Sequence, residues 1–144
     1  MKNKSQYIYN AIEWVKGQLN SKEYCTLCLA FVEDAYEMSN SVEIFGGSTA
    51  RESADEYSES DYKGIPEVGS FVFYDCSGTI GNEHKNWGHV GLYIGNEQVI
   101  HAWDVVRIDH YIGIETLPSA PGWSSPKYTG WVPFERIFKG YRIL

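Results

Sequence analysis

One cysteine and two histidines have the residue types and the spacing that thiol-based acyl chemistry requires. His89 and His101 stand in two strand-like segments on either side of a Gly-Asn turn signal, and Cys28 stands early in a segment with helical periodicity. A thiol nucleophile needs a base within hydrogen-bond reach, and the base needs a third group that fixes its tautomer. The three residues are therefore a candidate catalytic set, provided that the fold brings them together.

The length of the hairpin loop decides whether the two histidines share a face, because side chains alternate along a strand. A two-residue loop would put His89 opposite Ala102 and leave His101 on the other face. A three-residue loop would put His89 opposite His101, and a five-residue loop would leave them one diagonal apart on one face. We predict an odd loop or an equivalent bulge, and hence a shared face. Gly91 would leave a gap beside the histidines where the backbone of another element could approach. The opposite face is expected to be the apolar set Val90, Leu92, Ile94, Ile100 and Ala102.

A helix is predicted over about residues 26–38, with Thr26 as its N-cap and Cys28 in its first turn. Backbone N–H groups are unpaired there and the helix dipole favours an anion, so the pKa of Cys28 would be lowered and its thiolate would be a good nucleophile. A free cysteine is more often a small buried hydrophobic residue, which is the alternative for Cys28 taken alone. The helix is expected to turn Glu33, Asp34 and Glu37 toward water.

Cys25 and Cys28 also form a Cys-x-x-Cys pair, which suits a redox dithiol or half of a zinc site. The redox motif follows a strand, whereas the segment before this pair is helical. A zinc ion could recruit His89 and His101 as its other ligands, although the spacing matches no zinc finger or ribbon. Cys76 is expected to be an inert thiol.

Composition excludes several classes of protein. A chain of 144 residues indicates one domain over residues 1–144. The net charge of −7 argues against a nucleic acid or an anionic membrane as partner. No apolar run has the length of a membrane span, and the first 20 residues lack the apolar region of a secretory signal. We therefore expect synthesis in the cytoplasm without a signal peptide.

The remaining segments indicate an α+β fold, with helices first and an antiparallel sheet afterwards. Another amphipathic helix is predicted over residues 5–19, and a short one from a Ser48 or Thr49 cap to Tyr57. Residues 76–88 are expected to form a polar loop. Strands are predicted at residues 70–75, 105–108, 111–114, 128–134 and 141–144. The acidic residues Glu52, Asp55, Glu56, Glu59 and Asp61 are expected to form a solvated surface.

Three blocks of the sequence match one known pattern in order. Residues 28–32 read CLAFV, residues 66–73 read PEVGSFVF, and residues 89–102 read HVGLYIGNEQVIHA. They resemble the nucleophile block, the Pro-x-x-Gly-Asp-Leu-Val-Phe segment and the double-histidine hairpin of the NlpC/p60-type papain-like cell-wall cysteine peptidases. Ser70 stands where that family usually has Asp, and the Gly-Gly segment that usually precedes the nucleophile is absent.

The resemblance implies a papain-like fold in which N-terminal helices pack on an antiparallel β-sheet. It implies that Cys28 is the nucleophile, His89 the general base and His101 the residue that orients His89. The implied reaction is amide hydrolysis through a thioester in peptidoglycan stem peptides, with no metal and no cofactor. The related CHAP amidases usually have an acid or amide as third residue, a part that Asp104 could take if His101 pointed away. The expected substrate-binding residues are Tyr24, Gly88 and Trp103.

Three functional hypotheses follow from the resemblance. The first is a wall-lytic thiol protease or amidase, such as the catalytic domain of a phage endolysin, which acts on the bacterial cell wall and relies on a separate wall-binding domain. The second keeps the papain-like fold but changes the reaction to acyl transfer or deamidation. The third is a non-enzymatic module, either stapled by zinc or catalytically dead.

Overall fold

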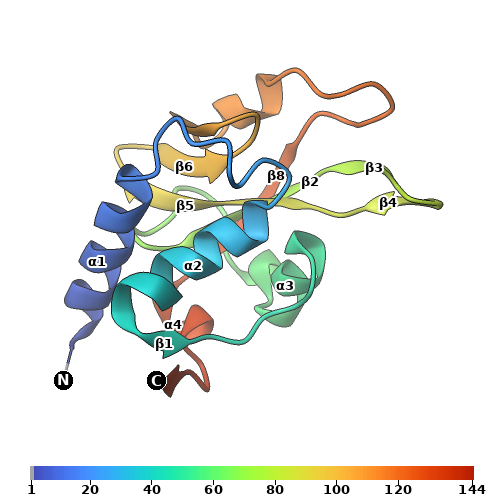
Figure 1. Ribbon diagram of the computed structural model, residues 1–144. Helices are drawn as coiled ribbons and strands as arrows, with labels where there is room; N and C mark the ends of the chain where they lie inside the picture. Colours follow the sequence, from blue (N-terminus) through green and yellow to red (C-terminus); the bar gives the residue numbers. More distant parts are fainter. Residues whose placement is uncertain (1) are drawn as a thin grey trace.

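The computed structural model describes residues 2–144 as helices packed on an antiparallel sheet (Figure 1). Its longer helices are α1 (Lys4–Lys16) and α2 (Cys28–Asn40), and its shorter ones are α3 (Ala50–Glu56) and α4 (Phe134–Ile137). No helix in the described part of the chain is long and apolar enough to cross a membrane. The strands are β1 (Val42–Glu43), β2 (Phe71–Asp75), β3 (Ser77–Ile80), β4 (Glu83–Asn86), β5 (His89–Gly95), β6 (Gln98–Ala102), β7 (Val106–His110), β8 (Lys127–Val132) and β9 (Arg142–Ile143).

The main sheet has the strand order β7-β6-β5-β2-β8, and each neighbouring pair in it is antiparallel. Two small ribbons, β1–β9 and β3–β4, lie outside it. Helices α1 and α2 come first in the chain and cover one face of the sheet (Figure 1). The predicted α+β class is therefore confirmed.

Helix α2 packs against the sheet through an apolar stripe. Its hydroxyl-bearing member, Tyr36, donates a hydrogen bond to the carbonyl oxygen of Gly69 at 2.7 Å, which ties the helix to the turn before β2. The helix begins and ends about two residues later than predicted, at Cys28 and Asn40. The fully buried members of the stripe are Phe31, Val32, Ala35 and Tyr36.

Alternation along β2, β5 and β6 divides the core into two layers. The layer on the helix side contains apolar side chains and includes Phe71 and Phe73. The opposite layer contains Val72 and Tyr74 and lies under the segment that follows β7. Other members of the helix-side layer are Val90, Leu92, Ile100 and Ala102, and other members of the opposite layer are Tyr93, Val99, Tyr111, Ile114, Leu117 and Trp131.

The β5–β6 hairpin contains a bulge. Tyr93 pairs with Val99 and Gly95 pairs with Gln98, so Ile94 is an extra residue in β5. The two residues after Gly95 form the turn and have φ angles of 53° and 61°, the combination that fits the twist of a tight hairpin. The turn thus lies one residue later than the Gly-Asn signal indicated. The bulge at Ile94 has the same effect on strand pairing as the odd-length loop that we predicted.

This register puts His89 and His101 on one face, as predicted, but one diagonal apart. The position across from His101 is occupied by Gly91. A Cβ at Gly91 would lie 3.0 Å from the Cβ of His101 and 2.3 Å from Cγ1 of Val99. Gly91 therefore makes room for cross-strand side chains, and the predicted approach of another element's backbone at this position is wrong.

Two other predicted segments differ from the structure. Residues 76–88 contain the β3–β4 ribbon, which extends away from the sheet in Figure 1, where a loop was expected. The segment predicted as a strand at residues 111–114 ends in the 3-10 helix Gly113–Thr116. The predicted short helix is confirmed as α3, and Thr49 caps it by accepting a hydrogen bond from the N–H of Glu52.

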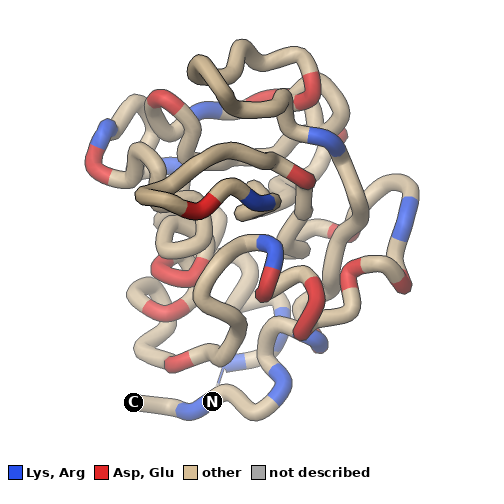
Figure 2. Tube along the Cα trace, turned by 90° about the vertical axis from the view of Figure 1, so that its right-hand side faces the viewer, with Lys and Arg blue, Asp and Glu red and all other residues tan. Residues whose placement is uncertain are grey.

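Basic and acidic positions are both spread over the trace in Figure 2. Arg51 shows how they pair, because its guanidinium contacts Asp55 at 2.7 Å, Glu59 at 2.8 Å and Asp75 at 3.0 Å. Glu59 is only 5% exposed. The expectation that all five acidic residues of this region are solvated is therefore wrong for Glu59.

Candidate active site

Cys28 is the first residue of α2, so it lies where backbone N–H groups are unpaired. The first helical hydrogen bond runs from the N–H of Phe31 to the carbonyl of Leu27 at 3.0 Å, and the N–H groups of residues 28–30 precede it. The N-cap is Leu27 and makes no side-chain hydrogen bond, while Thr26 has a φ of 68° in the preceding turn. The predicted Thr26 cap is wrong, but the predicted position of Cys28 in the first turn is confirmed.

Burial outweighs the helix end in the electrostatics of Cys28. It raises the pKa of the thiol to about 11, although part of the residue is exposed to solvent. Hydrogen bonds from the backbone of Val90 and Leu29 oppose this shift without cancelling it. The predicted lowering is therefore wrong for the thiol alone, and Cys28 needs a neighbouring base to become a nucleophile at neutral pH.

Helix α2 packs against β5, and the backbone of Val90 is close enough to the Cys28 sulfur to lower the pKa of the thiol. Val90 follows His89 in β5. The N-terminus of α2 therefore holds the Cys28 sulfur beside the start of the strand that carries His89. Nε2 of His89 is 2.8 Å from Nδ1 of His101. Nδ1 is then the nitrogen of His89 that remains to accept a proton from a thiol.

His89 lies in a closed aromatic setting. It is 3% exposed, and its ring centroid is 5.1 Å from that of Trp103, 5.0 Å from that of His101 and 5.9 Å from that of Tyr74. Burial, with a further contribution from His101, holds the pKa of His89 well below its usual value. His89 is thus a neutral imidazole at pH 7, which is the form that a general base requires.

The hydrogen-bond chain continues from His101 to a residue that sequence reasoning missed. Nε2 of His101 is 2.8 Å from Oδ2 of Asp109, and the Arg107 guanidinium donates to the same carboxylate. The strand predicted from the sequence covers residues 105–108 and ends one position before Asp109. The signal was the alternation of apolar and polar residues in β7, which would have put Arg107 and Asp109 on one face.

Asp104 does not take the place of His101. His101 points toward His89, and Asp104 instead accepts hydrogen bonds from the N–H of Val105 at 2.8 Å and from Arg107 at 3.3 Å. The condition under which Asp104 was the candidate third residue is therefore not met.

The three expected substrate-binding residues lie in different settings. Trp103 is partly exposed and stands edge-on against His89, so it forms a wall of the site. Tyr24 has its hydroxyl engaged by Asp34 at 2.7 Å, on the second turn of α2. Trp103 packs its ring against an imidazole of the histidine chain.

Gly88 lies in the segment that leads into His89. Its φ is +77°, and a Cβ there would lie 2.6 Å from the backbone nitrogen of Arg51. Its N–H donates to Oδ1 of Asn86 at 3.0 Å and lies 3.2 Å from the carbonyl of Cys76. Gly88 therefore holds the backbone before β5 in place.

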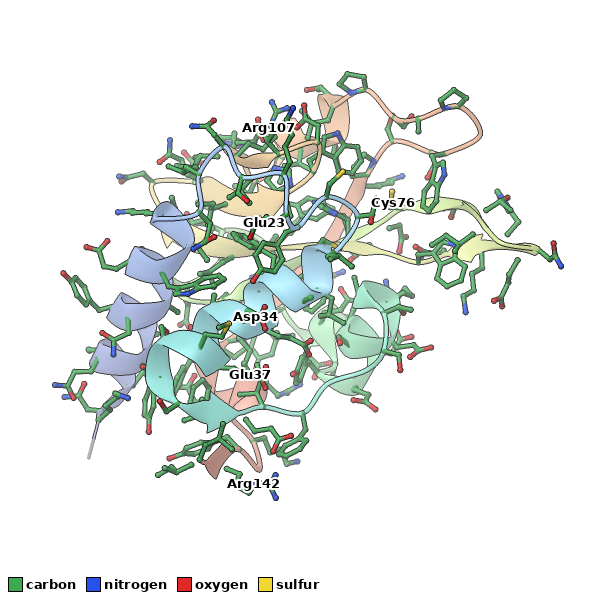
Figure 3. All side chains as sticks on the ribbon, in the orientation of Figure 1. Glu23, Asp34, Glu37, Cys76, Arg107 and Arg142 are labelled. Atoms are coloured by element: carbon green, nitrogen blue, oxygen red, sulfur yellow. The ribbon has the colours of Figure 1, made fainter. Side chains whose placement is uncertain are left out.

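The other cysteines and the acidic side of α2 complete the surroundings. Cys25 is exposed, and Cys76 is buried where β2 leads into β3 (Figure 3), with its sulfur 3.7 Å from the carbonyl of Ser124. Within residues 2–144, no group of three or more His, Cys, Asp and Glu side chains is arranged to hold a metal ion.

The helix carboxylates were expected to face water, but they are engaged or partly buried. Asp34 and Glu37 lie along α2 in Figure 3, and Glu37 accepts a hydrogen bond from the N–H of Ile44 at 2.9 Å. Burial, with Glu37 and Asp34 nearby, raises the pKa of Glu33 to about 7.

Comparison with known proteins agrees with this arrangement. The model of the NlpC/P60 family matches residues 17–120, which is well over half of the chain. The chain belongs to the NlpC/P60 family. Members of the NlpC/P60 family are typically cysteine peptidases, and the family acts on peptidoglycan. No curated protein sequence matches the chain significantly.

One departure from the NlpC/P60 pattern has a structural counterpart. Ser70, which stands at the position of the usual Asp, is fully buried, and its Oγ has no hydrogen-bond partner among the described residues. Its backbone is nevertheless paired, because its carbonyl accepts from the N–H of Tyr93 at 2.9 Å.

Proposed function

We propose that this protein is a cysteine endopeptidase or amidase that hydrolyses amide bonds in the stem peptides of peptidoglycan. The observation that carries the proposal is the continuous chain from His89 through His101 to Asp109, beside a thiol at a helix N-terminus. Membership of the NlpC/P60 family supports the cell wall as the site of action.

The proposed reaction assigns one role to each group. Nδ1 of His89 removes the proton from the Cys28 thiol, and the thiolate attacks the amide carbonyl. The N–H of Cys28, which precedes the first helical hydrogen bond, donates to the oxyanion. His89 then protonates the leaving amine, and a water activated by His89 hydrolyses the thioester to a carboxylate.

The raised pKa of Cys28 and the lowered pKa of His89 are compatible with this role. Burial disfavours the thiolate and the imidazolium when each is formed alone. Transfer of the proton from sulfur to nitrogen forms both charges together, and their mutual attraction in a poorly solvated site offsets part of that cost.

The finer biological role is also part of the proposal. We infer a wall-lytic enzyme of the endolysin kind, which acts on the cell wall and is directed there by a separate wall-binding domain. The net charge of −7 supports the need for such a domain, because it gives the protein no attraction to an anionic wall.

The test is hydrolysis of purified peptidoglycan, followed by zymography and by mass spectrometry of the released peptides. Cys28→Ala is expected to lower the rate on the order of 10³-fold or more, while the matched control Cys25→Ala keeps it. Lysis that survives in Cys28→Ala refutes the proposal, and loss in Cys25→Ala alone moves the nucleophile to Cys25. Products that carry an acceptor other than water would identify a transferase.

A further inference from the structure

The hydrogen-bond chain has a direction, which Asp109 determines. An ionised carboxylate only accepts hydrogen bonds, so Nε2 of His101, at 2.8 Å from Oδ2, carries a proton. A neutral imidazole has one donor and one acceptor, so Nδ1 of His101 accepts from Nε2–H of His89 at 2.8 Å. His89 is then left with an unprotonated Nδ1.

This direction requires that Asp109 stay ionised, and Arg107 provides for that. Its Nε donates to Oδ2 at 2.8 Å and its Nη2 to Oδ1 at 3.2 Å, which is a two-point contact on the carboxylate. Burial raises the pKa of Asp109, but the hydrogen bonds from His101 and Arg107 outweigh burial and hold it below its usual value.

The direction also requires that both histidines be neutral, and their burial provides for that. His101 is 0% exposed and His89 is 3% exposed. Burial lowers the pKa of His101, an effect that Asp109 and Asp104 partly oppose and that Arg107 reinforces. An imidazolium at His101 would have two donors and no acceptor, so it could not accept the proton of His89.

We propose that Asp109 is a positioning residue that fixes the tautomers of His101 and His89, so that Nδ1 of His89 is free to accept the proton of Cys28. Asp109 takes no proton itself, since the proton moves only between the Cys28 sulfur and Nδ1 of His89. The inference rests on the proposed function for its substrate, but it concerns proton positions that can be measured without substrate.

The first test compares three variants in peptidoglycan hydrolysis. Asp109→Leu removes the acceptor but keeps the branched shape of the side chain, and it is expected to lower kcat about 10- to 100-fold, with KM little changed. Asp109→Asn keeps one oxygen that can accept from His101. Its fall in log kcat is expected to be less than half of the fall in Asp109→Leu. The matched control is Asp104→Asn, which removes the other carboxylate on Arg107 and is expected to leave kcat within about twofold.

The second test needs no substrate, so it separates this inference from the proposed function. Nitrogen NMR of the imidazoles in the wild-type protein is expected to show a proton on Nε2 of both histidines at neutral pH. Alkylation of Cys28 by iodoacetamide is expected to slow at pH 7 in Asp109→Leu and to follow the wild-type pH profile in Asp104→Asn.

Three results would overturn the inference. The first is a proton on Nδ1 of His101 in the wild type, which decides the matter even if Asp109→Leu does not fold. The second is an alkylation profile of folded Asp109→Leu that matches the wild type, and the third is an Asn variant as slow as the Leu variant. A wild-type protein that hydrolyses no peptidoglycan but shows the expected tautomers and alkylation refutes the proposed function and leaves this inference standing.

Discussion

The two faces of the main sheet are equally buried but are stabilised in different ways. Phe71 and Phe73, on the helix side, are 0% and 1% exposed, and Val72 and Tyr74, on the histidine side, are also 0% and 1% exposed. The strands β2, β5 and β6 contribute only apolar side chains to the helix side, and these need no hydrogen-bond partners. The histidine side buries polar atoms, and the hydroxyl of Tyr74 is satisfied by the carbonyl of Tyr111 at 2.6 Å. The comparison shows that the two histidines lie on the face that buries polar groups and depends on hydrogen bonds and pH, whereas Cys28 packs against the helix-side layer.

The largest expected effect on stability comes from the helix side. Phe71→Ala should lower the free energy of unfolding by about 3–5 kcal/mol, because it removes a fully buried ring between the sheet and the helices. Urea unfolding at pH 5 and at pH 8 should give the same loss. The paired variant Tyr74→Phe, on the histidine side, should cost about 1 kcal/mol, since it deprives one carbonyl of its donor. Equal losses in the two variants would contradict the comparison.

The histidine side should make stability depend on pH in the acid range. Folding lowers the pKa of His89 and His101 below the usual 6.5, so the unfolded chain binds more protons and the free energy of unfolding falls as pH drops below about 6.5. Urea titrations between pH 8 and pH 5 measure this slope. His101→Gln should flatten it, whereas the exposed control His84→Gln should not change it. A slope that survives in His101→Gln and in His89→Gln would assign the effect to other groups.

The smallest effect should come from Glu33 and should have the opposite sign. Its pKa is raised to about 7, so its contribution to stability is present below 4.5 and is lost as pH rises through 7. Glu33→Gln should therefore stabilise the protein at pH 8, by about 1 kcal/mol or less because solvent screens the charge, and should change nothing at pH 4. Thermal unfolding at both pH values is the measurement, with the exposed Glu13→Gln as control. A destabilised variant at pH 8 would mean that the Glu33 carboxylate has a stabilising partner.

Patterns within single segments predicted much of the site. The periodicity of α2 was enough to put Cys28 in a first turn, and alternation with loop parity was enough to put His89 and His101 on one face. Asp109 was missed because its contact depends on the pairing of β6 with β7, in which it lies beside Val99. No pattern within β7 alone reveals that register.

Features that depend on packing between distant segments were also missed. Glu33 and Glu59 look like surface residues in the sequence, but the fold partly buries Glu33 and buries Glu59 beside Arg51. The pKa of Cys28 was predicted in the wrong direction, because a helix end is visible in the sequence and the burial of its first residue is not. The β3–β4 ribbon was missed because its residues are polar and lack the alternation that identifies strands.

The β1–β9 ribbon joins parts of the chain that are far apart in sequence. Val42 pairs with Ile143, and the N–H of Leu144 donates to the carbonyl of Ser41 at 3.0 Å, just beyond the end of α2. Closing so long a loop costs more conformational entropy than closing the β5–β6 hairpin, whose partners are neighbours in sequence. The order of assembly should follow this difference. The ribbon that displays the imidazoles can form early from local contacts, and the tail locks the far end of the nucleophile's helix only in the last stage of folding.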